Sequence, residues 1–367
     1  MFDQKISQFK RQKGTVLITV ILVVAFIALL IVEINKRVNY QSTLARNLIH
    51  RDQAYSYLIG MEELAKIYLQ KGFDKEKEDT VHLNQAWAQS DITFPIDGGG
   101  MTATIKDMQS CFNLNSLGDK DKSNNNQLGQ NNQANQSLVG PQPVKPSATG
   151  NLNYTNPNNQ NEKTIGEEIF ADYLDSVLVD SVIKPEALAA ELRDWIDEDY
   201  TPSGPDGVED LYYQGLEVAY LPANGEIAHK SELLAVRSFN GKIMSLIDED
   251  ICVLPDAKAN QINVNTLSSD SAHLLHAALG KNVVLTKVKE LISSRPDKGY
   301  DMKGFWDELG SGAKIKSDLK SRLTDTSRFF QMKSKAQINT TKVFMTTLFV
   351  KDDSNRFKVV SRYFGKD

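Results

Sequence analysis

The sequence predicts an α+β fold in which a large, mainly α-helical domain is inserted into an antiparallel sheet. A helical pattern begins at Thr15 and continues to about residue 71, and short strand-like runs follow it before residue 117. Residues 164–334 are mostly helical, and strand-like runs return in residues 335–367. Because strands on both sides of a helical block can share one sheet, the simplest topology is one α+β domain with a helical insertion.

Length and charge limit the classes of function. The chain has 367 residues, enough for two compact domains. Its 42 basic and 47 acidic side chains give a net charge of −5, so there is no overall basic field to attract nucleic acid. The two cysteines, Cys111 and Cys252, exclude a disulfide scaffold. They can form one bridge in an exported chain, or they can be two unrelated thiols.

The N-terminus has the charge pattern of a membrane anchor. A basic leader, residues 1–14, precedes the uncharged segment Thr15–Val32. As a helix this segment spans ~27 Å, close to the ~30 Å of a bilayer core. The basic leader should stay in the cytoplasm, which sends the rest of the chain outward. An ordinary secretory signal is shorter and ends in a small-residue cleavage site, so a signal anchor and a specially processed leader remain as the alternatives.

The junction Arg11-Gln12-Lys13-Gly14, directly before the apolar segment, resembles that of type IV pilins and pseudopilins. The resemblance implies that a prepilin peptidase removes the leader after Gly14 and that Thr15 becomes the methylated first residue. Residues 15–36 are then the transmembrane part of the N-terminal helix. Most such subunits carry Glu at the fifth mature position, where this chain has Thr19. A chain without this Glu resembles the K-type minor pseudopilin of type II secretion systems, which sits at the filament tip.

Residues 37–117 are expected to form the rest of this helix and the first strands of the pilin fold. Apolar residues recur at three- and four-residue steps, and Gly72 is expected to end the helix. Residues 92–107 are predicted to form a hairpin with its turn at Gly98-Gly99-Gly100. The phrase FNLN, which begins at Phe112, resembles a signature of the K-type family.

The remaining segments complete the predicted organisation. Residues 118–163 are rich in Asn, Gln, Ser, Pro and Gly, and are predicted to be a flexible insertion. Residues 164–334 are the inserted helical domain, and residues 335–367 are strands that complete the pilin sheet. The K-type family is expected to have this same layout.

An acidic loop is the segment richest in chemically distinctive side chains. Between Glu167 and Glu217 there are fifteen acidic residues and two basic ones, Lys184 and Arg193. Oxygen ligands on a Pro- and Gly-rich loop suit calcium, which accepts irregular cages of oxygens. The spacing is not that of an EF-hand, since Pro202 falls where glycine is required. From spacing alone, a solvated acidic loop and a calcium site are equally good interpretations.

The resemblance favours the calcium site. The phrase WIDED, which begins at Trp195, and the segments around Asn224 and Glu232 resemble the calcium-binding region of the K-type family. By resemblance, structural calcium is expected here, with Tyr212 or Tyr213 packed nearby. The candidate ligands are Asp197, Asp199, Asp206, Glu209, Asn224 and Glu232.

A second motif offers a competing function. The segment Ile262–Thr266, with a following helix and Gly280, resembles SAM-like and helix-hairpin-helix units, some of which bind DNA phosphates. The second glycine of a phosphate-binding hairpin is absent, and the lysines are scattered. A packing unit is therefore favoured. The alternative is a membrane-anchored DNA-binding component of a competence-type pilus.

The complete pattern leads to one functional expectation. The sequence contains no G-x-S-x-G, H-E-x-x-H, Walker or dinucleotide-binding motif, so an enzyme is not expected. The K-type resemblance implies a minor pseudopilin that caps the pseudopilus tip and nucleates its assembly. It also implies a single pass through the bacterial inner membrane, with most of the chain in the periplasm. The implied partners are the I-type and J-type minor pseudopilins, the H-type and major pseudopilins below them, prepilin peptidase, exported substrates and the outer-membrane secretin; nucleic acid is not among them.

Overall fold

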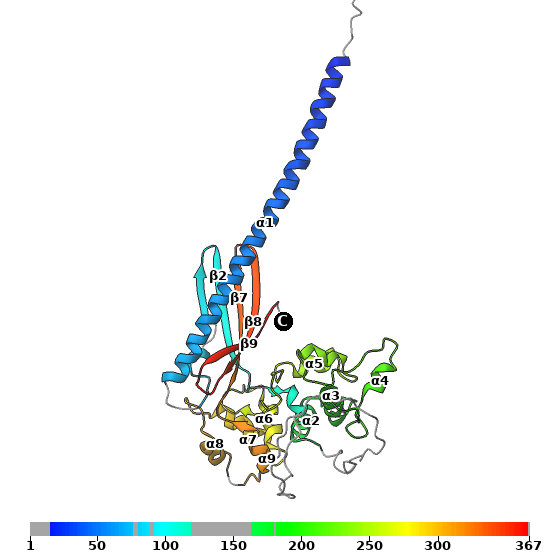
Figure 1. Cartoon of the computed structure of the whole chain (residues 1–367). Helices are drawn as coiled ribbons and strands as arrows, with labels where there is room; N and C mark the ends of the chain where they lie inside the picture. Colours follow the sequence, from blue (N-terminus) through cyan, green and yellow to red (C-terminus); the bar gives the residue numbers. More distant parts are fainter. Residues whose placement is uncertain are drawn as a thin grey trace, which may run out of the picture.

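The fold is given by a computed structural model that describes residues 15–75, 80–88, 92–118, 163–179, 181–310 and 312–365. Figure 1 shows one long helix, a sheet packed beside its C-terminal half, and a mainly helical domain at the end of the sheet. The predicted leader, including Gly14, and nearly all of the predicted insertion at residues 118–163 lie outside the described residues.

Helix α1 extends from Thr15 to Lys75, and its 61 residues span ~90 Å at 1.5 Å per residue. Its N-terminal part protrudes from the rest of the molecule (Figure 1) and contains a window with a mean hydropathy of 3.3, none of it buried. Within the described residues it is the one helix long and apolar enough to cross a membrane. Gly72 does not end the helix. A Cβ there would lie 3.2 Å from Cδ1 of Trp87, so glycine allows this ring to approach the helix.

Five antiparallel strands form the sheet in the order β1-β2-β7-β8-β9. The strands are β1 (Ile92–Ile96), β2 (Gly99–Asp107), β7 (Phe329–Ile338), β8 (Thr341–Lys351) and β9 (Phe357–Phe364). Strand β7 starts earlier than the predicted boundary at residue 335. Exposed or half-exposed Gln331, Lys333 and Lys335 alternate with buried residues in its first part, which hides the strand from a search for apolar runs.

Helix α1 covers one face of this sheet, mainly over β7 and β8. One stripe of α1 is fully buried there, and it packs with Trp87, Phe330 and Phe349. The stripe consists of Ala54, Leu58, Met61, Ala65 and Leu69. Their spacing of three and four residues is that of one helix face, so the predicted α+β fold with a long N-terminal helix is confirmed.

The described residues between β2 and β7 are mainly helical and have a separate apolar core. The helices are α2 (Ile165–Val177), α3 (Pro185–Ile196), α4 (Asp210–Gln214), α5 (Gly241–Ile247), α6 (Ala272–Leu279), α7 (Leu285–Ser293), α8 (Met302–Leu309) and α9 (Ser317–Lys320), with 3-10 turns at η2 (Leu114–Gly118) and η4 (Lys230–Ala235). A further 3-10 turn, η1 (Ala86–Ala88), lies before β1. Two short parallel pairs join β3 (Phe112–Asn113) to β4 (Ile251–Cys252) and β5 (Ile262–Asn263) to β6 (Leu323–Thr324).

Buried Asp107, at the end of β2, connects the sheet to the helical domain. Its carboxylate accepts hydrogen bonds from the hydroxyls of Thr266 and Ser327, both at 2.6 Å, from Nδ2 of Asn263 at 3.1 Å and from the backbone N–H of Gln109 at 2.8 Å. Burial raises the pKa of Asp107, and these four donors oppose that rise. Since buried polar groups need partners, this network favours one arrangement of the two parts.

Two further asparagines each bind the backbone of a distant residue. Asn115 belongs to the FNLN phrase, and Asn265 belongs to the segment Ile262–Thr266. Asn115 donates from Nδ2 to the carbonyl of Ile227 at 3.0 Å and accepts from the N–H of Ile227 at 2.8 Å. Asn265 makes the same two-way contact with Tyr300. Close by, Cys111 and Cys252 are joined in a disulfide, with their Cα atoms 5.8 Å apart. Both sequence segments therefore have packing roles. Through Ile227, Asn115 also fixes the backbone three residues after Asn224.

Candidate metal centre

The acidic loop begins where α3 ends. Trp195 and Ile196 are buried in the helical core, and Asp197 is the C-cap, with an extended backbone at φ −75° and ψ 163°. The N–H of Asp197 still donates to the carbonyl of Arg193 at 2.9 Å. The anchored apolar side chains thus fix the position from which the acidic residues leave the helix.

Asp194 folds the loop back on itself. Its buried carboxylate accepts hydrogen bonds from the N–H of Ser203 at 2.9 Å and from the N–H of Val208 at 2.6 Å. Gly207 is required by this close approach, because a Cβ there would lie 2.4 Å from Oδ2 of Asp194. Gly204 supplies a left-handed turn at φ +76°. The result is that Glu209 returns to the end of α3.

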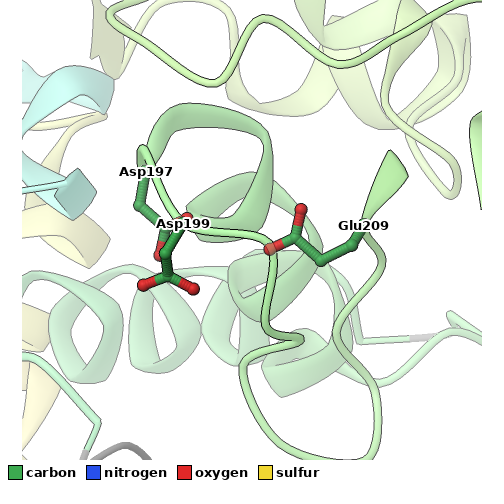
Figure 2. A group of neighbouring side chains, drawn as sticks. All are labelled: Asp197, Asp199 and Glu209. Carbon is green, nitrogen blue, oxygen red and sulfur yellow. The ribbon is translucent and has the colours of Figure 1, made fainter. Parts of the chain in front are cut away.

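Asp197, Asp199 and Glu209 meet at this point. Each offers one carboxylate oxygen, and these atoms all lie within 4.8 Å of one another. In Figure 2, Glu209 reaches across from the returning part of the loop toward Asp197 and Asp199. Asp197 and Glu209 are each only 6% exposed. Asp199 is exposed, whereas the buried carboxylates of Asp197 and Glu209 repel one another unless a proton or a cation lies between them.

Among these residues, Glu209 gives the strongest indication of a cation-binding site. Both of its carboxylate oxygens are buried and have no hydrogen-bond partner. Burial, together with the negative charges of Asp194, Asp197, Asp199 and Asp210, raises the pKa of Glu209 to about 8. A buried carboxylate without partners is costly, and a divalent cation bound by oxygen ligands would remove that cost. The residues therefore fit a hard cation of the calcium type.

Asn224 contacts Asp210, the residue that follows Glu209. The Nδ2 of Asn224 donates to Oδ1 of Asp210 at 3.2 Å. Its Oδ1 is buried and has no hydrogen-bond partner, and its backbone is left-handed at φ +44°. An amide oxygen of this kind is a suitable additional ligand for calcium.

The other two predicted ligands are not part of this group. Glu232 forms a capping box at the start of η4, where its Oε1 accepts from the N–H groups of Ala228 at 2.8 Å and His229 at 3.0 Å. Asp206 lies in the turn between Gly204 and Gly207, and its charge acts on Glu191. Sequence reasoning missed Asp194 as an organiser of the site. The available signal was an acidic residue directly before the apolar residues Trp195 and Ile196 at the end of α3.

Aromatic side chains pack under the loop as expected. Tyr213 is buried against Trp195, with ring centroids 5.2 Å apart, and against Tyr220 at 5.3 Å. Tyr212 is more exposed, and the guanidinium of Arg237 lies 5.1 Å from its ring centroid. Tyr213 is therefore the tyrosine that supports the loop from the core side.

Two basic residues of the DNA-binding alternative are Lys281, in the hairpin between α6 and α7, and Lys287, in α7. Lys281 forms an ion pair with Asp172 at 3.0 Å, and this contact raises the pKa of Lys281. Lys287 lies 3.5 Å from Glu290 and 3.9 Å from Glu308. These cations are thus matched by acidic residues of the same domain, which disfavours a phosphate-binding role.

Comparisons with known proteins agree with this architecture. Residues 110–256 match the family described as type II secretion system, protein K. The type II secretion system protein K of Aeromonas hydrophila is 28% identical over 97% of this chain and 98% of its own length. The protein of the same name from Dickeya chrysanthemi is also 28% identical, with the same coverage of both chains.

A solved structure has the same fold over most of the chain. It belongs to the crystal structure of the GspK-GspI-GspJ complex from the type 2 secretion system of enterotoxigenic Escherichia coli. The similarity has a TM-score of 0.67 and 25% sequence identity, and it covers 88% of this chain and 99% of the solved one. This chain is therefore similar to the type II secretion system protein K family over residues 110–256, and to proteins of that name along nearly its whole length.

Proposed function

We propose that this chain is the minor pseudopilin that caps the pseudopilus of a type II secretion system and nucleates its assembly. Members of the family are structural, non-enzymatic components of a secretion system, and this chain is a minor pseudopilin of that kind. The observation that carries the capping role is the position of the helical insertion. It lies at the end of the sheet farthest from the protruding apolar part of α1 (Figure 1).

The capping role follows from how subunits with such helices stack. In a filament, the apolar parts of the N-terminal helices pack together, and each globular part lies above the one before it. A broad domain at the far end of this chain occupies the space that a following subunit would need. A subunit with this shape is compatible with the last position and is unfavourable at positions below it.

Thr19 also favours the last position in the filament for this chain. Its hydroxyl donates to the carbonyl of Val16 at 2.9 Å, so its hydrogen bond is made within its own helix. A carboxylate in a bilayer requires a cationic partner, such as the N-terminal amine of a neighbouring subunit. Thr19 makes no such demand, which suits a subunit that has no neighbour above it.

The proposal includes the processing and the location of the chain. The leader would be removed after Gly14, and Thr15, the first residue of α1, would then be the methylated N-terminus. The apolar part of α1 would cross the inner membrane once, since basic residues precede it. The sheet and the helical domain would then lie in the periplasm, an oxidising compartment that suits the disulfide between Cys111 and Cys252.

The proposed partners are the I-type and J-type minor pseudopilins, because the similar solved structure is a complex of proteins K, I and J. The H-type and major pseudopilins would follow below them, and prepilin peptidase would act before assembly. Exported substrates and the outer-membrane secretin are the proposed contacts of the exposed helical domain.

Calcium is the proposed structural ion of the helical domain. Asp197, Asp199 and Glu209 would hold it, with Oδ1 of Asn224 as a further ligand. The ion would neutralise the three carboxylates and connect the end of α3 to the start of α4. Its role would be to fix this loop, since a bound ion stabilises the folded state.

The capping proposal is tested by locating the chain on assembled pseudopili. An epitope tag at the C-terminus of the full chain is labelled with gold on pseudopili sheared from cells, and wild-type secretion is verified first. Gold at one filament end is the expected result. Gold spaced along the filament would contradict capping, and normal pseudopili in cells that lack the chain would contradict nucleation.

A further inference from the structure

A pocket lies beside the hairpin that links α6 to α7, where α2 and α9 pack close to α6 (Figure 1). Its volume is about 410 Å³, which is in the range of small-molecule sites in proteins. Ala171, Leu279 and Leu319 contribute buried apolar side chains to its lining. Gly280 has φ +80°, and a Cβ there would lie 3.0 Å from Cδ1 of Leu319. The hairpin and α9 are therefore packed directly against each other at one wall of the pocket.

The hairpin in this pocket is the one that resembles a phosphate-binding turn. A DNA-binding hairpin presents its backbone to the phosphates of a long polyanion. Here the hairpin shares the pocket with three carboxylates, those of Glu168 and Asp172 in α2 and of Glu186 in α3. Because three carboxylates repel a polyanion, the hairpin suits a ligand of different chemistry.

Two ion pairs connect opposite sides of the pocket. Nζ of Lys281, in the hairpin, lies 3.0 Å from Oδ1 of Asp172, and Nζ of Lys316 lies 2.8 Å from Oε1 of Glu168. Glu168 and Asp172 are one turn apart on α2, so the two pairs are about 6 Å from each other. The two lysine side chains are 70% and 64% exposed, and ion pairs this exposed are weak. A charged ligand can therefore displace them.

Further charges of both signs line the same pocket. Within the described part of the chain, neither Lys163 nor Lys314 nor Glu186 forms an ion pair. Nδ2 of Asn282 donates to the carbonyl of Lys314 at 3.2 Å, which fixes the backbone at that lysine. A ligand with only negative charge would meet three carboxylates, and a ligand with only positive charge would meet four lysines. The lining thus favours a ligand that carries one charge of each sign.

We propose that this pocket binds a short zwitterionic peptide of two or three residues, with its carboxylate beside Lys281 and Lys314 and its amino group beside Glu186. The apolar part of the peptide would lie against Leu279 and Leu319. Two or three extended residues span ~7–11 Å, so the terminal charges of such a peptide can reach both signs of charge in the lining. A free amino acid carries both charges on one carbon and cannot separate them in this way. The site does not depend on the capping role.

The test measures peptide binding to the full chain in detergent by ligand-observed NMR. Trialanine, Ala-Leu-Ala and trileucine are the probes, and N-acetyl-trialanine and trialanine amide each lack one terminal charge. The uncapped peptides should bind saturably. Each capped peptide should bind about tenfold more weakly than trialanine, because it loses one charged contact. Inorganic phosphate and free alanine should also bind about tenfold more weakly or less.

Two variants and a matched control identify the contacts. Lys281→Gln should weaken trialanine binding about tenfold and leave trialanine amide within about twofold, since only a free carboxylate needs this lysine. Glu186→Gln should weaken trialanine equally and leave N-acetyl-trialanine within about twofold. Lys358→Gln is the control, because its ion pair with Asp352 has the same length of 3.0 Å and its side chain is similarly exposed. Thermal melting verifies that all three variants fold.

Several results would overturn the proposal. Absence of saturable binding by all three tripeptides would do so, as would equal weakening of trialanine by Lys281→Gln and Lys358→Gln. Capped peptides that bind as tightly as trialanine would show that the terminal charges are not recognised. Phosphate that binds as tightly would assign an anion site, and alanine that binds as tightly would assign a free amino acid in place of a peptide. The gold-labelling experiment tests the capping role separately from all of these outcomes.

Discussion

Arg362 of β9 forms an ion pair with Glu62 of α1, with Nη2 2.8 Å from Oε1, and Glu62 is fully buried. The hydroxyl of Thr347 also donates to Glu62, at 3.3 Å. The pair joins the last strand to the long helix, 300 residues away in the sequence. The pair therefore connects α1, which precedes the inserted domain in the sequence, to β9, which follows it.

Removal of the arginine charge should destabilise the fold. Arg362→Met leaves Glu62 buried beside Thr347 and a more distant Lys66, so we expect the free energy of unfolding to fall by about 2 kcal/mol. Arg356→Met, which removes the exposed ion pair with Asp352, is the control and should change it by less than about 0.5 kcal/mol. Urea unfolding measures both. Equal effects of the two substitutions would contradict the role given to the buried pair.

Calcium removal should lower the melting temperature of the wild-type chain. A ligand present at a hundred times its dissociation constant stabilises a fold by about 2.7 kcal/mol, so the shift is measurable by calorimetry with and without a chelator. Glu209→Gln should abolish most of this shift, because Glu209 supplies a buried oxygen of the cluster. Asp206→Asn, outside the cluster, should retain the shift. An unchanged wild-type midpoint after chelation would reject a structural ion.

The pH dependence of the chelated protein provides a separate test of the same carboxylate. The pKa of Glu209 is raised to about 8 in the fold, above its ordinary value of 4.5. Between these values the folded state holds a proton that the unfolded state has released, so stability falls as the pH rises from about 4.5 to about 8. Glu209→Gln should flatten this fall, and it is followed by urea unfolding across the range. A chelated wild type whose stability rises over this range would contradict the cluster described here.

Loss of the disulfide should destabilise the chain strongly. Cys111 and Cys252 close a loop with a sequence separation of 141, so the bond restricts the unfolded chain over a long distance. We expect the double variant Cys111→Ala/Cys252→Ala to lose about 3 kcal/mol of unfolding free energy. Denaturant unfolding with and without a reductant measures the effect. The reductant should change the wild type and leave the double variant unchanged; a wild type insensitive to complete reduction would contradict the prediction.

Local sequence patterns predict much of this fold because they reflect which residues of each element are buried. The uncharged run from Thr15, the helical spacing of Leu58 and Leu69, and the strand-like segments near both ends were enough to predict the anchor and the α+β fold. Boundaries were less accurate where a pattern was mixed. Strand β7 was placed too late because its lysines interrupt the apolar residues, and Gly72 was expected to end α1 when it serves to admit Trp87.

The sequence by itself determined the kinds of residue at the candidate metal centre, and only the tertiary structure decided which of them meet. Asp197 and Glu209 come together because Asp194 folds the loop and Gly207 allows the close approach, whereas Glu232, equally acidic, caps a helix turn. The physical reason is that periodicity records which side of an element faces the core. The meeting of distant side chains depends instead on where buried hydrogen bonds and chain turns place them. Asp107 and Ser327, 220 residues apart, show this at the junction of the two parts.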